Sequence, residues 1–93
     1  MNTFENLMET ISNHLNQNLR QDYRKIWVQG HLNSNNVRFV FTVFNRDNTY
    51  RFAFLDLKNV RLPKGNSTQE EVDQITSDFF GRIHPTVKEF LVD

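Results

Sequence analysis

Three histidines and a scattered set of carboxylates are the residues of this 93-residue chain that could perform acid–base or metal chemistry. His14, His31 and His84 lie far apart, and none has a second histidine or a carboxylate at metal-ligand spacing. Cysteine is absent, which excludes a disulfide framework, a thiolate nucleophile and Cys-ligated zinc. The three isolated glycines form no phosphate-binding loop. We therefore expect a protein that is not an enzyme and that holds no metal or cofactor.

Carboxylates gather where a second helix is predicted to begin. Residues 69–73 read Gln-Glu-Glu-Val-Asp, and one more acid follows before any basic residue. Acidic side chains at a helix N-terminus are favoured by the helix dipole. The same side chains could form an acidic ridge that a basic protein partner recognises. The candidate partner-binding acids are Glu70, Glu71, Asp73 and Asp78.

Aromatic and β-branched residues fill three segments that we predict to be strands, over 25–32, 37–44 and 49–57. Two four-residue runs of turn formers, 33–36 and 45–48, separate them. Such short connections favour an antiparallel meander.

Two amphipathic helices flank these strands. Apolar residues recur every three or four positions over 3–20, which predicts a first helix. A capping box, Ser67 with Glu70 or Thr68 with Glu71, predicts the start of a second helix. Pro85 disfavours helical dihedrals at His84, so we expect a break there and a short last helix starting at Pro85. The predicted fold is a single α+β domain over 1–93 in the order α-β-β-β-α, with both helices on one face of the meander.

The predicted strands are apolar on both faces, although two helices can cover only one of them. The second face must be covered by the chain's own C-terminal segment, by a second copy or by another partner. We predict a homodimer or partner surface there. Trp27 and Tyr50 are the candidate aromatic anchors for a partner, and the candidate dimer-interface residues are Val40, Phe44 and Leu55.

RNA binding is an alternative, because residues 20–64 hold nine basic and only three acidic residues. The element order is that of double-stranded-RNA-binding domains, and Arg38, Arg46 and Arg51 could act together with the strand aromatics. That family, however, grips phosphate with lysines at the start of its last helix, where this chain carries acids. Nucleic acid is therefore the less favoured partner.

The pattern of elements resembles the YezG-like immunity proteins over roughly residues 7–80. The resemblance rests on the leading amphipathic helix, on Asp22-Tyr23-Arg24-Lys25-Ile26-Trp27-Val28, on the aromatic strand 37–44 and on the acidic segment 69–73. It implies a non-enzymatic bacterial antitoxin that binds and neutralises a cognate toxin, in this family a nuclease. More broadly, the chain resembles the immunity proteins of contact-dependent and related polymorphic toxin systems, which are cytoplasmic and often dimeric. A phage-encoded inhibitor of a host nucleic-acid-handling complex remains an alternative. We expect a cytoplasmic protein without membrane contact, because the N-terminus lacks a signal-peptide pattern and no apolar run reaches ~18 residues.

Overall fold

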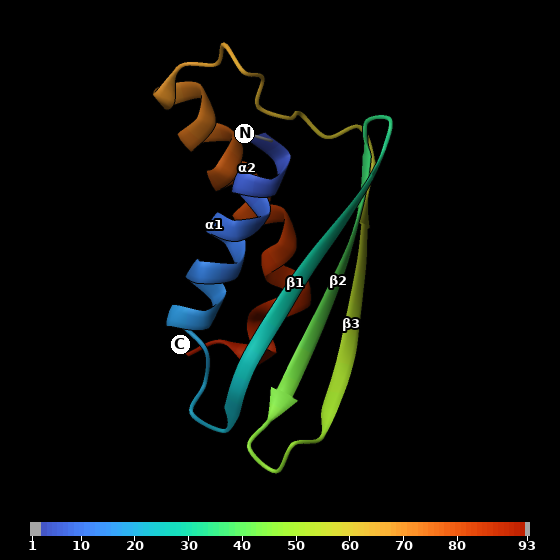
Figure 1. Cartoon of the computed structure of the whole chain (residues 1–93), viewed down its shortest axis with the longest axis vertical. Coiled ribbons are helices and arrows are strands. Elements are labelled where there is room, and N and C mark those ends of the chain that lie inside the picture. Colours follow the sequence, from blue (N-terminus) through green and yellow to red (C-terminus); the bar gives the residue numbers. More distant parts are fainter. Residues whose placement is uncertain (1–2, 93) are drawn as a thin grey trace.

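Two helices cover one face of a three-stranded antiparallel sheet in the computed structural model, which describes residues 3–92 (Figure 1). The elements are α1 (Thr3–Gln17), β1 (Tyr23–Asn33), β2 (Asn36–Asn45), β3 (Tyr50–Leu57), α2 (Gln69–Val87) and the 3₁₀ turn η1 (Lys88–Phe90). The strands pair in the order β1-β2-β3 and form a meander. The predicted α+β class, element order and placement of both helices on one face are confirmed.

The helix-facing side of the sheet forms the core. Phe39 of β2 stacks on Phe41 with ring centroids 5.7 Å apart and meets Phe79 of α2 edge-on at 5.9 Å. Burying such aromatic side chains is among the largest contributions to the stability of a small domain. The side chains that α2 buries against the sheet are Ile75, Phe79, Ile83 and Val87.

Helix α1 lies over the edge strand β1 and contacts it closely at two points. The Asn16 carboxamide accepts a hydrogen bond from the Ile26 backbone N–H (3.0 Å) and donates one to the Ile26 carbonyl (2.9 Å). Near the start of α1, the Met8 side chain lies against Gly30, where a Cβ atom would come within 2.5 Å of the Met8 sulfur. The absent side chain at Gly30 thus lets the helix approach the strand closely.

Helix α1 ends three residues before the predicted boundary at residue 20. Asn18 donates from its backbone and from its side chain to carbonyls of the last turn. Leu19 then forms an isolated antiparallel bridge with Leu91. The chain leaves the helix because this pairing with the C-terminal segment replaces a further helical turn.

Helix α2 begins with Thr68 as its N-cap, so the second of the two predicted capping registers is the one used. The Glu71 backbone N–H donates to the Thr68 hydroxyl oxygen at 3.2 Å. The predicted break at His84 and the predicted short helix starting at Pro85 are both wrong, because α2 continues through Pro85 to Val87 and the 3₁₀ turn η1 follows it. Pro85 lies in the last turn, so it removes a single hydrogen bond near the end of the helix, and buried Val87 continues the apolar stripe.

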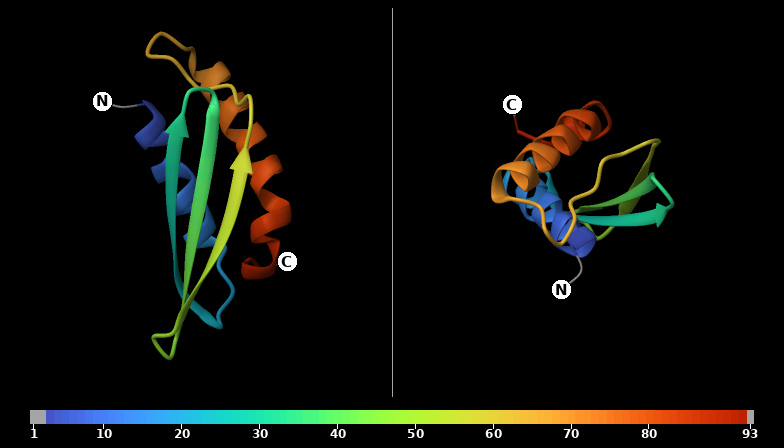
Figure 2. Two further views of the ribbon diagram at one scale, coloured as in Figure 1. Left: turned by 90° about the vertical axis from the view of Figure 1, so that its right-hand side faces the viewer. Right: turned by 90° about the horizontal axis from the view of Figure 1, so that it is seen from above.

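The C-terminal segment packs against the α1–β1 connection on the helix side of the sheet. The backbone N–H of Arg20 donates to the Phe90 carbonyl at 3.0 Å, and the backbone N–H of Val92 donates to the Asn18 carbonyl at 2.8 Å. Figure 2 shows that the other face of the sheet has no helix or loop over it among the described residues. Within that part of the chain, the second apolar face is therefore not covered by the chain's own C-terminal segment.

Candidate interaction surface on the open face of the sheet

The side of the sheet turned away from the helices carries four cross-strand rows. Three of them form an array of nine side chains, which we call the open face, and the fourth row, His31–Arg38–Asp56, borders it. The middle row of the array joins Trp27 of β1, Thr42 of β2 and Phe52 of β3. Thr42 thus occupies the centre of a three-by-three array. The two outer rows are Lys25–Phe44–Tyr50 and Gln29–Val40–Phe54.

Four aromatic side chains of this array are about half exposed. The exposed fractions are 49% for Trp27, 58% for Tyr50, 52% for Phe52 and 65% for Phe54. Thr42, between Trp27 and Phe52, is only 5% exposed because it is smaller than its neighbours. Single exposed apolar residues are common on protein surfaces, but a contiguous aromatic group of this kind marks an interaction site.

The rings also contact one another. Tyr50 lies edge-on to Phe52 with centroids 5.5 Å apart, and Phe52 lies 6.0 Å from Phe54 along the same strand. Phe44 of β2 joins this group at 5.9 Å from Tyr50. Because residues two apart on a strand project from the same face, β3 holds its three rings in a row. The rings are therefore ordered before any partner arrives, which lowers the entropic cost of binding.

Charged side chains lie at both ends of the open face. At one end the Arg24 guanidinium stands 5.4 Å from the centroid of the Phe44 ring, beside Lys25. At the other end Arg38 donates two hydrogen bonds to the Asp56 carboxylate, at 2.8 and 3.3 Å. These bonds hold the pKa of Asp56 below its ordinary value, and the same partner raises the pKa of Arg38. The Arg38–Asp56 pair therefore adds no net charge to its end of the face.

The structure brings together four of the sequence-predicted residues and separates a fifth from them. Trp27, Tyr50, Val40 and Phe44 all lie on the open face. Leu55 does not share this face, which corrects the expectation that it lies beside them. It pairs with the buried Phe39 and packs against the helix-side core, because residues directly opposite on paired strands share a face.

Phe52 and Phe54 are the aromatic residues of the open face that were not among the candidates predicted from the sequence. Both follow Tyr50 at two-residue intervals, so the period of a strand places all three on the same face. The two-residue spacing from Tyr50 could have identified Phe52 and Phe54 from the sequence. The alternate residues of the strand, Ala53 and Leu55, face the helices.

The acidic residues of α2 lie on the other layer of the molecule, away from the open face. Glu71 belongs to the N-cap: its carboxylate accepts from the Thr68 hydroxyl at 3.3 Å and lies 3.7 Å from the Arg61 guanidinium. Asp73 accepts a hydrogen bond from Gln69 at 2.8 Å. The predicted partner-binding residues therefore divide between two surfaces, with Trp27 on one and the acids on the other.

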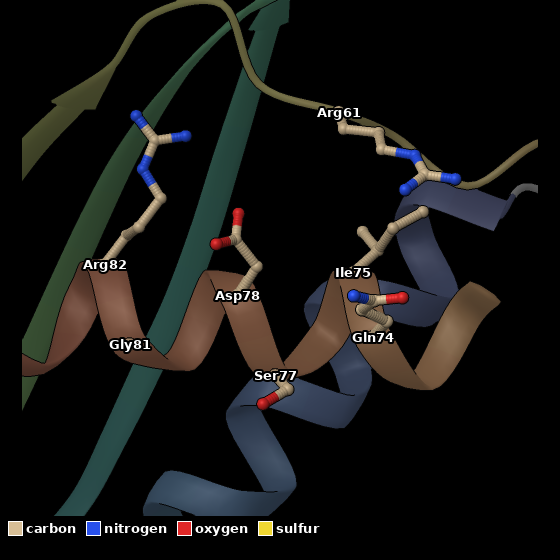
Figure 3. Close-up of a pocket in the computed structure, with 7 residues that line it drawn as sticks. All are labelled: Arg61, Gln74, Ile75, Ser77, Asp78, Gly81 and Arg82. Atoms are coloured by element: carbon tan, nitrogen blue, oxygen red, sulfur yellow. The ribbon is translucent and has the colours of Figure 1, made fainter. Parts of the chain in front are cut away.

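Asp78 lines a groove of about 530 Å³ between α2 and the connection that follows β3. Figure 3 shows Asp78 and Arg82 projecting from α2 toward the segment that carries Arg61. Arg82 also donates to the Lys58 carbonyl at 3.4 Å. One carboxylate thus lies in a groove lined with two guanidinium groups, so this region is not a purely acidic ridge.

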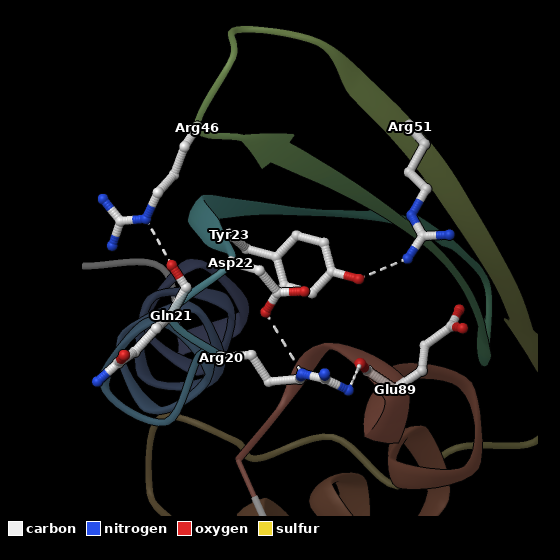
Figure 4. A network of polar contacts seen from close by, with 7 residues as sticks. All are labelled: Arg20, Gln21, Asp22, Tyr23, Arg46, Arg51 and Glu89. Carbon is white, nitrogen blue, oxygen red and sulfur yellow. Dashed lines mark hydrogen bonds and ion pairs between the residues drawn. The ribbon is translucent and has the colours of Figure 1, made fainter.

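The three arginines considered for RNA binding do not gather on one surface. Arg38 is paired with Asp56 on the sheet, as described above. Arg46 donates to the Gln21 carbonyl, and Arg51 donates to the Tyr23 hydroxyl at 2.7 Å, at the end of the molecule shown in Figure 4. Arg51 pairs with the buried Val43, so it lies on the helix-facing side of the sheet. These positions give no continuous basic track along the aromatic residues.

Metal-ligating side chains do not cluster within residues 3–92: no group of three or more histidines, aspartates or glutamates is placed to hold an ion there. His14 lies against the Phe80 ring with centroids 4.4 Å apart. In the same part of the chain, no helix is long and apolar enough to cross a membrane.

No family model, no curated protein and no solved structure matches this chain. The open face, with its ordered aromatic rings, is therefore the main structural basis for a functional inference.

Proposed function

We propose that this protein is a non-enzymatic, cytoplasmic immunity protein that binds and neutralises a bacterial toxin, and that the open face is its toxin-contacting surface. The observation that carries the proposal is the group of four half-exposed aromatic side chains, Trp27, Tyr50, Phe52 and Phe54, on one rigid sheet. An inhibitor of this kind needs no reaction of its own. It needs a stable surface that complements the toxin.

Exposed aromatic side chains favour a protein partner, because tryptophan and tyrosine are enriched among the few residues that supply most of the binding energy of an interface. Tyr50 and Trp27 each combine an apolar ring with one polar group, so they can bury area and still form a hydrogen bond. Arg24 and Lys25 at the border of the array provide the charged rim that surrounds many such surfaces.

The resemblance to YezG-like immunity proteins supplies the partner class, a nuclease toxin. Because the acids of α2 lie on the opposite layer from the open face, Glu70 and Asp73 act on a basic toxin at a distance and attract it during encounter. The aromatic array makes the direct contacts. In this division of roles, the acids raise the association rate, and the aromatic rings lengthen the lifetime of the complex.

The test begins with a search of the neighbouring genes for a large secreted protein with a C-terminal nuclease domain. That domain is then produced in a toxin-sensitive host with the chain or with a variant of it. We expect Phe52→Glu to weaken binding in a purified pull-down by at least about 30-fold and to abolish protection, as for a central hot spot. Leu32→Glu is the matched control, because Leu32 is 47% exposed but lies on the other face of the sheet. Undiminished protection by Phe52→Glu would refute the assignment of the open face.

A charge-reversal variant distinguishes the role of the α2 acids from that of the open face. Replacing Glu70 and Glu71 with lysine should slow association at low salt and leave the dissociation rate unchanged. Loss of the complex in this variant, together with full binding by Phe52→Glu, would move the contact surface to α2.

RNA binding by the same rings predicts a different result. A stacking platform formed by Tyr50, Phe52 and Phe54 with Arg24 and Lys25 would retain single-stranded RNA on a filter, and retention would fall steeply between two salt concentrations. We expect no such retention by the native chain. Salt-dependent retention that Phe52→Glu removes would replace the immunity proposal with an RNA-binding module.

A further inference from the structure

We infer that, when the chain is alone, a second copy covers the open face, so that two sheets pack face to face in a symmetric dimer with Thr42 of each copy near the two-fold axis. This inference goes beyond the proposed function, because it requires only this chain. It also adds a form of regulation, since a toxin that uses the same face must displace the second copy.

The size of the surface matches what a stable dimer requires. An aromatic side chain carries about 150–250 Å², so the four half-exposed rings together present roughly 450 Å² of surface. The remaining members of the array and the neighbouring Arg38 and Asp56 side chains bring the face to roughly 800 Å², the usual share of one partner in a standard interface. Two apolar sheet faces of this kind pack at about 10 Å separation in β-sandwiches.

The charges allow one open face to approach another. The chain has a formal net charge of zero, so two copies do not repel each other as whole molecules. Lys25 is the single charged member of the array and lies at a corner beside Arg24, so these positive charges gather at one end of the face. The neighbouring Arg38 is neutralised by Asp56 at 2.8 Å. A face so weakly charged has little electrostatic penalty for meeting its own copy.

Symmetry determines which residues meet. A closed two-fold dimer uses the same patch on both copies. For two sheets packed face to face the axis runs between them, through the centre of the shared patch. With the row of Arg38 and Asp56 included, the centre of the patch lies on the middle strand β2, between Thr42 and Val40. The β2 strands of the two copies therefore lie opposite each other, whatever the angle between the sheets.

Trp27 provides a direct measurement, because it is the only tryptophan of the chain and lies 49% exposed on the open face. We expect its fluorescence emission to shift to shorter wavelength as the concentration rises from about 0.1 to 100 μM, since dimerisation removes the ring from water. Sedimentation velocity over the same range should show a change from monomer to dimer.

Two variants decide whether the open face is responsible. Phe52→Glu should raise the dimer dissociation constant at least tenfold with an unchanged circular dichroism spectrum, whereas Leu32→Glu should leave it within threefold of the native value. A native chain that stays monomeric at 100 μM, or a dimer that Leu32→Glu disrupts and Phe52→Glu does not, would overturn the inference.

The position of Thr42 near the two-fold axis is tested by cross-linking, because the native chain contains no cysteine. In Thr42→Cys a short bis-maleimide should join two copies, and in Leu32→Cys, on the other face, it should not. Dimers that cross-link only through position 32 would contradict the face-to-face arrangement. Because these measurements use the chain alone, their failure would leave toxin binding by a monomer unaffected.

Discussion

The clamp between Asn16 and Ile26 gives a prediction that can be worked out from the structure. The Asn16 carboxamide pairs with both backbone polar groups of Ile26, with bonds of 3.0 and 2.9 Å, on the outer edge of β1. This contact joins the last turn of α1 to the edge strand and occupies edge groups that could otherwise pair with another strand. We predict that Asn16→Ala destabilises the domain although the side chain is exposed.

The magnitude follows from the two bonds to Ile26. The Asn16 amide also donates to the Ser12 carbonyl within α1 at 2.9 Å, a local bond on an exposed helix face that water can replace. Each intramolecular hydrogen bond contributes about 0.5–1.5 kcal/mol, and water can reach the vacated edge, so the loss is about 1–2 kcal/mol in total. Alanine is a better helix former than asparagine by up to about 0.7 kcal/mol, which opposes the loss. The matched control is Asn13→Ala, an exposed position of the same helix, which makes the same change in helix propensity.

The assay is thermal and urea unfolding of both variants at one fixed protein concentration. Asn16→Ala should be about 1–2 kcal/mol less stable than Asn13→Ala, which lowers Tm by roughly 4–16 °C in a domain of this size. Hydrogen exchange at the Ile26 amide should also become faster, because that N–H loses its acceptor. Equal stability of the two variants would refute the reasoning and show that water replaces the clamp without cost.

Three further predictions concern the core, an ion pair and the cap of α2. Ile75→Ala should lower the free energy of unfolding in urea by about 2–5 kcal/mol, because the side chain is 4% exposed and truncation leaves a cavity. The pKa of Asp56 lies below its ordinary value because Arg38 donates to it. Stabilisation by this pair is therefore present above about pH 4 and lost as the pH falls through the folded pKa. In an NMR titration the Asp56 midpoint should rise toward 3.8 in Arg38→Gln, and an unchanged midpoint would exclude Arg38 as the cause. Reversal of Glu70 and Glu71 to lysine should cost roughly 0.3–1 kcal/mol per residue in thermal unfolding, and no change would mean that the helix dipole is not compensated there.

The sequence alone predicted the type and order of the elements, because these depend on local periodicity. A period near 3.6 marks α1 and α2, alternation and β-branched or aromatic composition mark the strands, and Thr68 with Glu71 marks the start of α2. The apolar character of both strand faces was also visible in the sequence, and so was the shortage of helices to cover them. Helix ends were less well predicted where tertiary contacts decide them. Leu19 leaves α1 to pair with Leu91, and α2 continues through Pro85.

Tertiary structure alone decided which strand face lies under the helices. Alternation along β3 places Phe52 on one face of the strand and Leu55 on the other. Both faces are apolar, so hydrophobicity does not show which of them the helices cover. The choice depends on the side to which the connections before β1 and after β3 carry the helices, and this is a property of the whole chain. The same choice separates Trp27 from the acids of α2 and turns Arg51 toward the core side. Local pattern therefore identified most of the candidate side chains, whereas only the packing of the helices on one face determined which of them form a common surface.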